Sequence, residues 1–124
     1  MHDFRRLDVW HRTVDLAVTV YGYTATFPSA ERFGLTSQMR RSAVSMVSNI
    51  AEGAGRRSAK DIRHFLLIAR GSASELEAQA ILSHRLGFLD ADSMTEIALQ
   101  ADEVRAMLFG LGRNLIGDRD ENER

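Results

Sequence analysis

The stretch Met94–Leu115, MTEIALQADEVRAMLFGLGRNL, decides the fold class of this chain. Its apolar residues recur at unbroken spacings of three and four, at positions 94, 97, 101, 104, 108, 111 and 115. This spacing places all of them on one face of an α-helix. The average period of about 3.5 residues is typical of left-handed, coiled-coil-like packing. The sequence therefore predicts a long helix that packs within a bundle.

Three further helical patterns precede this stretch, and none of them alternates with the period of two that marks a strand. Pro28 is expected to stop the first helix, because its ring clashes with the preceding turn. Thr36 is a candidate N-cap for the second helix, and Ser58 for the third. The four helices are expected at about residues 8–27, 36–53, 59–86 and 91–117. Short links between them favour an all-α, antiparallel up-down-up-down four-helix bundle.

The length of 124 residues corresponds to one domain. Residues 1–117 are assigned to the bundle, and residues 118–124, DRDENER, to a charged tail that is predicted to be disordered because it has nothing to bury. The apolar stripes of the first and third helices are wider than one bundle core needs. An oligomer is therefore expected, with a thick core and some exposed aliphatic residues as the alternative.

The composition excludes several classes of protein. Hydrophobic residues make up 44% and charged residues 27% of the chain, unlike a disordered protein. The absence of cysteine excludes disulfides, thiolate metal sites and cysteine nucleophiles. No apolar run approaches the roughly 20 residues that span a bilayer, and no signal core follows the first residues. The expected location is the cytoplasm, with no membrane partner.

The sequence offers no support for catalysis. Asp8 with His11 and Asp61 with His64 have the spacing of half a di-metal site, but no inward glutamate pair accompanies them on the second and fourth helices. Nucleophile-elbow, dinucleotide-binding and phosphate-loop motifs are absent from the sequence. We therefore expect no catalytic residue, no metal, no cofactor and no enzymatic activity.

The net charge of −1 hides an uneven distribution. Residues 36–70 carry seven basic against two acidic residues, and residues 71–124 carry five basic against eleven acidic ones. The seven cations are Arg40, Arg41, Arg56, Arg57, Lys60, Arg63 and Arg70. Arginine binds phosphate through two parallel hydrogen bonds, so these residues are the candidate nucleic-acid site. The alternative is a set of helices that attract one another through opposite charges.

Small and polar residues mark the middle of the second and third helices. The candidates for helix packing or a subunit interface are Ser45, Ser48, Asn49, Glu52 and Glu75. Short side chains let helix backbones approach closely, and spacings of three and four place such polar groups on neighbouring surface. They are predicted to form a polar network between helices or subunits, and simple exposure to solvent is the alternative.

Two stretches resemble a known family: Arg32–Ser45, RFGLTSQMRRSAVS, and Ser48–Gly53, SNIAEG. With Gly71-Ser72 and the segment 75–77 they resemble the bacterial four-helix bundle proteins linked to 23S rRNA intervening sequences, over about residues 3–116. The resemblance implies an antiparallel bundle that assembles into a ring-like homopentamer without enzymatic activity. A related branch, the accessory proteins of diversity-generating retroelements, binds a reverse transcriptase and nucleic acid. Val47 stands where the family usually has proline, and the pI of about 6.4 is lower than in the basic retroelement branch.

Together the residues and the resemblance predict a non-enzymatic, oligomeric four-helix bundle. RNA or a ribonucleoprotein is its leading expected partner, and the related branch implies a reverse transcriptase as a protein partner. The alternative is a structural protein–protein interaction module that binds no nucleic acid.

Overall fold

The computed structural model describes the backbone of residues 2–123 and the side chains of residues 2–115. Four α-helices follow one another: α1 (Asp8–Thr24), α2 (Leu35–Ala54), α3 (Ala59–Arg85) and α4 (Ala91–Glu123). Two single-turn 3-10 helices accompany them, η1 (Phe4–Arg6) before α1 and η2 (Ser29–Glu31) in the link to α2. Residues 2–123 contain no strand. The predicted all-helical class with four helices is confirmed.

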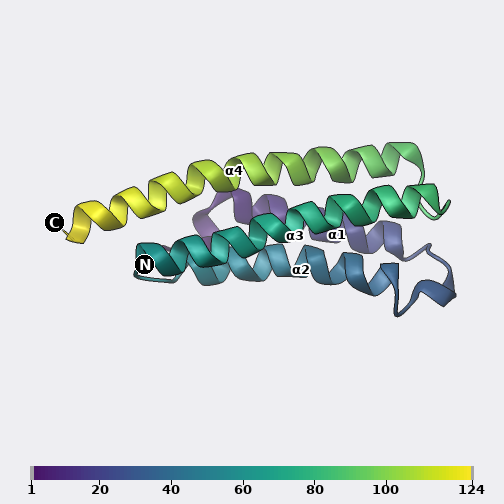
Figure 1. Ribbon diagram of the computed structural model, residues 1–124, viewed down its shortest axis with the longest axis horizontal. Helices are drawn as coiled ribbons and strands as arrows, with labels where there is room; N and C mark the ends of the chain where they lie inside the picture. Colours follow the sequence, from purple (N-terminus) through teal and green to yellow (C-terminus); the bar gives the residue numbers. More distant parts are fainter. Residues whose placement is uncertain (1, 124) are drawn as a thin grey trace.

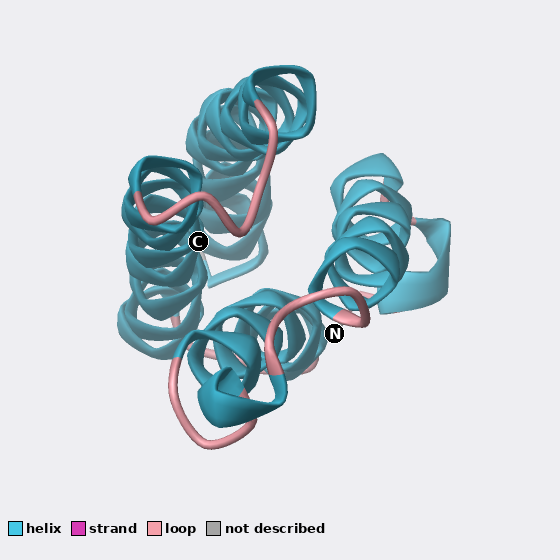
Figure 2. Cartoon of the chain, turned by 90° about the vertical axis from the view of Figure 1, so that its right-hand side faces the viewer, coloured by secondary structure: helices cyan, strands magenta, loops and turns pink. Residues whose placement is uncertain are grey.

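Neighbouring helices in the sequence are neighbours in space. The contacts between α2 and α3 and between α3 and α4 are the most extensive, and α1 contacts both α2 and α4. Figure 1 shows that α1 and α3 begin at the end that holds the N-terminus, whereas α2 and α4 begin at the opposite end. Seen end-on, the helices surround one interior, with the α1–α2 and α3–α4 links toward the viewer (Figure 2).

The interior is apolar and draws on all four helices. In α4 the predicted face is buried at Ile97, Ala101, Val104, Leu108 and Leu115, while Met94 and Leu111 are half-buried at its edge. Other fully buried large side chains are Leu16, Val20, Met39, Met46, Ile50, Ile62 and Leu76. Removal of this apolar area from water is the main driving force for the fold.

The helix ends match the expectations in part. The Ser58 hydroxyl accepts a hydrogen bond of 3.1 Å from the backbone N–H of Asp61, as a cap should. The predicted cap Thr36 is wrong, because α2 begins at Leu35 with Gly34 as N-cap. The carboxylate of Glu31 accepts the hydrogen bond of 3.3 Å from the Leu35 N–H instead. Glu31 of η2 thus caps the start of α2, a role that the sequence analysis gave to the Thr36 hydroxyl.

α1 ends at Thr24, before the predicted stop at Pro28. Phe27 then turns into the interior, where its ring centre lies 5.8 Å from that of Phe88. Together, Phe27 and Phe88 close the core between the α1–α2 and α3–α4 links.

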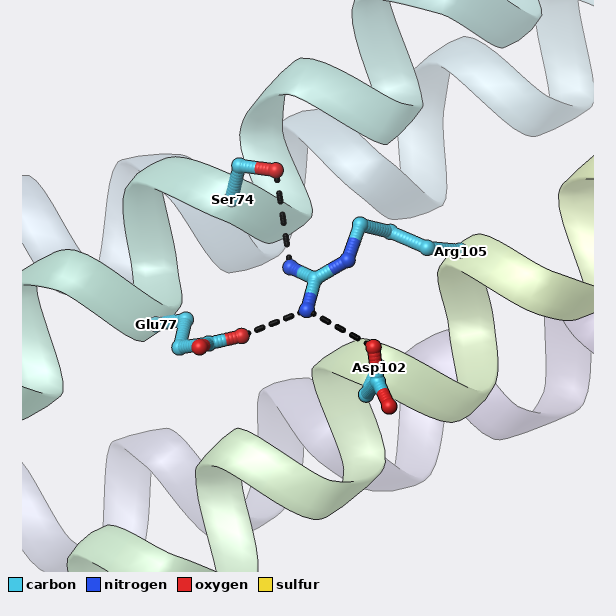
Figure 3. A network of polar contacts seen from close by, with 4 residues as sticks. All are labelled: Ser74, Glu77, Asp102 and Arg105. Carbon is cyan, nitrogen blue, oxygen red and sulfur yellow. Dashed lines mark hydrogen bonds and ion pairs between the residues drawn. The ribbon is translucent and has the colours of Figure 1, made fainter.

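Arg105 ties α4 to α3. Its guanidinium donates to Glu77 at 2.5 Å and to Asp102 at 3.1 Å, and more weakly to the Ser74 hydroxyl at 3.4 Å (Figure 3). The hydrogen bond to Glu77 raises the pKa of Arg105 above its ordinary value. This arginine is therefore committed to the bundle and is not a free cation of its surface.

The separate tail at 118–124 stays a prediction. The backbone of α4 is helical to Glu123. The side chains of residues 116–124 lie outside the described residues, and so does the assignment of that tail. Across the part of the chain that is described, no helix is both long and apolar enough to cross a membrane.

Candidate interaction surfaces

The seven predicted nucleic-acid-binding cations do not form one patch. Arg40 and Arg41 lie in the first half of α2, near the α1–α2 link, whereas Arg56 and Arg57 follow its last turn. At 1.5 Å per residue, sixteen residues of helix separate the two pairs by roughly 25 Å. The pattern of charge along the sequence therefore merges two distinct surfaces.

Arg40 is held by α1. Its Nε donates a hydrogen bond of 2.9 Å to the Thr24 hydroxyl, and its Nη2 one of 3.3 Å to the Tyr21 carbonyl. Its Cζ also lies 4.5 Å from the centre of the Tyr21 ring, within the range of a cation–π contact. These contacts fasten the C-terminus of α1 to α2, which is a structural role.

The opposite end of the bundle carries exposed positive charge. The N–H of His2 donates a hydrogen bond of 2.8 Å to the Ala54 carbonyl, which places η1 beside the α2–α3 link. We call Arg6, Arg57, Lys60 and Arg63 the basic end; all four are exposed, and none of them forms an ion pair with another described residue. Four exposed acids lie in the same region: Asp3, Asp8, Glu52 and Asp61.

Other cations near the basic end are partly engaged. Arg56 contacts Glu52 at 3.0 Å and lies over the Phe65 ring, with its Cζ 4.8 Å from the ring centre. Arg5 pairs with Asp3 at 3.0 Å, and this hydrogen bond lowers the pKa of Asp3. Both pairs are exposed and therefore weak, so they reduce the positive potential of this end without removing it.

A polar groove runs between α2 and α3. It holds a cavity of about 640 Å³, lined by Arg41 of α2 and Glu75 of α3. Hydroxyls and amides bridge its floor: Ser72 donates to Ser45 at 2.8 Å, and Ser42 donates to Gln79 at 3.0 Å. These hydrogen bonds form a polar network between α2 and α3 through Ser42, Ser45, Ser72 and Gln79.

Of the five predicted interface residues, two belong to this network. The Asn49 amide donates to the Ser45 carbonyl at 2.8 Å and to its hydroxyl at 3.0 Å. Ser48, Glu52 and Glu75 are exposed, and Glu75 lines the groove. Ser48 is exposed within this chain, and its role in packing or at an interface stays a prediction.

The other flank of α2 is apolar and exposed. A 370 Å³ cavity there is lined by Val14, Ala17, Val18, Tyr21, Val44 and Val47. Val18 is 68% exposed, and the nearby Phe33 on the link is 86% exposed. The sequence predicted that the apolar stripe of the first helix is wider than one core needs, but not which part of it is internal. The part with Leu16 and Val20, continued by Phe27, faces the core, and the part through Val14 and Tyr21 is the outer one.

We call this apolar flank, the outer side of α2 and the polar groove together the α2 surface. A further cavity of 660 Å³ at the α1–α2 link joins its two flanks, because Tyr21 and Val44 line one side and Arg41 and Ser45 the other. The described residues include no group of three or more His, Asp or Glu side chains placed to hold a metal ion.

The sequence matches the family model described as "23S rRNA-intervening sequence protein" over residues 5–110. The chain belongs to this family. The match covers all of α1, α2 and α3 and the first part of α4, so it includes both the basic end and the α2 surface.

A crystal structure from Bacteroides thetaiotaomicron VPI-5482 has a similar fold, with a TM-score of 0.77 and 23% sequence identity. The similarity covers 85% of this chain and 95% of that one. That protein is described as one of unknown function from the S23 ribosomal protein family, and at this identity it supports the fold alone. Comparison with curated proteins gives no match.

Proposed function

We propose that this protein is a non-enzymatic, self-assembling four-helix bundle that associates with RNA through its basic end. The observation that carries the proposal is the meeting of η1 with the α2–α3 link, which gathers Arg6, Arg57, Lys60 and Arg63. The name of the family, which refers to a sequence inserted in 23S rRNA, supports RNA as the partner.

The basic end suits the phosphate backbone rather than a base sequence. Three of its four cations are arginines, whose planar guanidinium groups bind phosphate through two parallel hydrogen bonds. Each phosphate that they neutralise releases condensed counterions, so affinity falls steeply with salt. Weak binding of this kind becomes useful when several copies act on one RNA, because linked sites bind with an avidity beyond that of each one.

Assembly is the second part of the proposal. We infer that each protomer is an antiparallel up-down-up-down bundle and that the α2 surface is its interface with other copies. Exposed Val18 and Phe33 support this, since large apolar side chains grouped on one face mark contact surfaces. A ring-like homopentamer is the assembly that the family resemblance implies, and a ring would repeat the basic end once per subunit.

The apolar flank of the α2 surface also favours a second candidate function. A protein–protein interaction module without nucleic acid would use the same exposed valines, and it would leave the basic end idle. The two functions are distinguished by whether nucleic acid is bound to the protein.

The ratio of absorbance at 260 and 280 nm of the protein purified from cells at low salt tests the proposal. We expect a high ratio that falls after ribonuclease treatment. The double variant Arg57→Glu with Lys60→Glu should show a low ratio from the start. Its matched control, Arg32→Glu with Arg85→Glu, makes the same charge change at the opposite end and should keep the high ratio. A low ratio for the unaltered protein favours the interaction module.

A further inference from the structure

A second site of positive charge lies on the face made by α3 and α4. A cavity of 410 Å³ there has an apolar floor, and three arginines line it: Arg63 and Arg70 from α3 and Arg113 from α4. Two apolar side chains at the cavity are exposed, Leu67 at 56% and Phe109 at 64%. The α2 surface shares no residue with this cavity.

The charges around the cavity are of one sign. No carboxylate lines it, and Arg63, Arg70 and Arg113 form no ion pair with any described residue. Arg63 and Arg70 are two helical turns apart, about 10 Å along α3, so they lie toward different ends of the cavity. The acids Glu77 and Asp102 lie farther along the same face, where Arg105 already binds both.

We propose that this cavity binds one base of a single-stranded RNA, stacked against Phe109, while Arg63, Arg70 and Arg113 contact the flanking phosphates. The inference rests on the proposed function and deepens it. The basic end contacts only the phosphates of the RNA, and the cavity adds a site for one of its bases. Arg63 belongs to both surfaces, so a strand bound at the basic end can continue into the cavity.

The chemistry of the site matches a nucleotide. Proteins that bind single strands combine a positively charged path for the backbone with aromatic rings on which bases stack. Gly112 adds no side chain to the floor, and the volume lies within the range of small-ligand cavities. An acidic peptide would satisfy the arginines, but it has no need of an exposed ring, which is why the observations favour RNA.

The test compares two fluorescent probes that differ only in their bases. One is an oligouridylate of about ten nucleotides, and the other is an abasic oligoribonucleotide of the same length and charge. Fluorescence anisotropy with the full-length protein at low salt gives both affinities. We expect the unaltered protein to bind oligouridylate about five-fold or more tightly than the abasic probe, which is the size of effect that one stacked base produces.

Variants locate the base. Phe109→Ala should bind both probes equally, at the affinity of the unaltered protein for the abasic one. Leu99→Ala is the matched control, because Leu99 is also an exposed apolar residue of α4, at 65%, and lines none of the cavities described above. It should keep the preference for oligouridylate. Phe109→Trp should keep it too, and its fluorescence should fall on binding, measured against the Trp10 background of the unaltered protein.

The remaining outcomes separate this inference from the proposed function. Equal binding of both probes by the unaltered protein, or an unchanged preference in Phe109→Ala, overturns the base site and leaves the basic end in place. Failure of both probes to bind overturns the proposed function itself. An acidic, leucine-containing peptide is a further probe. If the protein binds this peptide in a way that depends on Phe109, and shows no preference between the two RNA probes, the cavity is a protein-docking site and the inference is contradicted.

Discussion

The hydroxyl of Ser72 on α3 donates a hydrogen bond of 2.8 Å to the hydroxyl of Ser45 on α2. Two small hydroxyl side chains therefore form a hydrogen bond with each other between the helices. The Ser72 side is buried, with 6% of the residue exposed. Because neither side chain fills the space outside this bond, a groove remains open along the outer side of the same helix pair. The bond thus links the packing of α2 on α3 to the shape of the α2 surface.

Ser72→Leu tests this packing. The larger side chain has to displace α2, and it removes one of the two hydrogen bonds that the Ser45 hydroxyl accepts, the other coming from Asn49. We therefore expect the free energy of unfolding to fall by about 1–3 kcal/mol. Urea denaturation followed by circular dichroism measures the change. Ala78→Leu is the control, because Ala78 is exposed on α3 outside the α2 surface and should tolerate a leucine. Equal losses in the two variants would show that Ser72 is not on the face of α3 that packs against α2.

Val18→Glu tests the role of the α2 surface in assembly. Val18 is 68% exposed, so a charge there should leave the fold of a protomer intact and weaken contact with another copy. Light scattering in moderate salt should give a mass several times 13.9 kDa for the unaltered protein and a lower mass for the variant. Leu99→Glu, at a similarly exposed position outside the α2 surface, should assemble normally. A monomeric unaltered protein at micromolar concentration contradicts the interface.

Asp90 makes the start of α4 sensitive to acid. Its carboxylate accepts a hydrogen bond of 2.7 Å from the Ser93 N–H, and this bond lowers the pKa of Asp90 below its ordinary 3.8. A carboxylate with a lowered pKa in the folded state stabilises the protein above its ordinary pKa, and the contribution is lost as the pH falls through the lowered value.

The Tm of Asp90→Ala should therefore lie below that of the unaltered protein at pH 7, and the difference should shrink below about pH 4. Asp90→Asn keeps the acceptor but cannot titrate, so its deficit should be smaller at pH 7. Thermal scans across this pH range provide the measurement. A constant difference between Asp90→Ala and the unaltered protein at all pH values would show that the carboxylate is not the stabilising group.

The acidic end of the chain should compete with RNA. Residues 118–124 carry four acids and two arginines. In an antiparallel bundle, the end of α4 lies at the same end as the α2–α3 link, and Figure 1 places the C-terminus on that side. We expect deletion of residues 118–124 to raise the affinity for RNA at low salt and to have little effect at high salt, where charges are screened. Equal affinities at low salt would show that these residues do not mask the basic end.

The helices could be read from the sequence because each depends on periods and caps that are local. The spacing from Met94 to Leu115 predicted the buried face of α4, and the Ser58 cap lies where its spacing to Asp61 placed it. The start of α2 could not be predicted in this way. Its first N–H is bound by Glu31, whose position depends on the folding of the whole link.

The surfaces were less predictable, because a sequence does not say which part of a wide apolar stripe faces inward. The burial of Leu16 and Val20 decides that question for α1, and it leaves Val18 outside. A run of basic residues likewise does not show whether they share one surface. Arg40 and Arg57 belong to one basic stretch of the sequence but lie at opposite ends of α2. The meeting of Arg63, Phe109 and Arg113 could not be foreseen, since it requires the register of α3 against α4.

The salt dependence of RNA binding tests the central claim most directly. The Kd for a single-stranded RNA is measured by anisotropy over a series of salt concentrations, for the unaltered protein and for Arg57→Glu with Lys60→Glu. For the unaltered protein we predict that the logarithm of the binding constant falls steeply and linearly with the logarithm of the salt concentration. The variant should bind more weakly, and its slope should be smaller by about 1–2, because each lost phosphate contact removes about 0.7 from the slope. Identical slopes and affinities in the two proteins would contradict the assignment of RNA to the basic end.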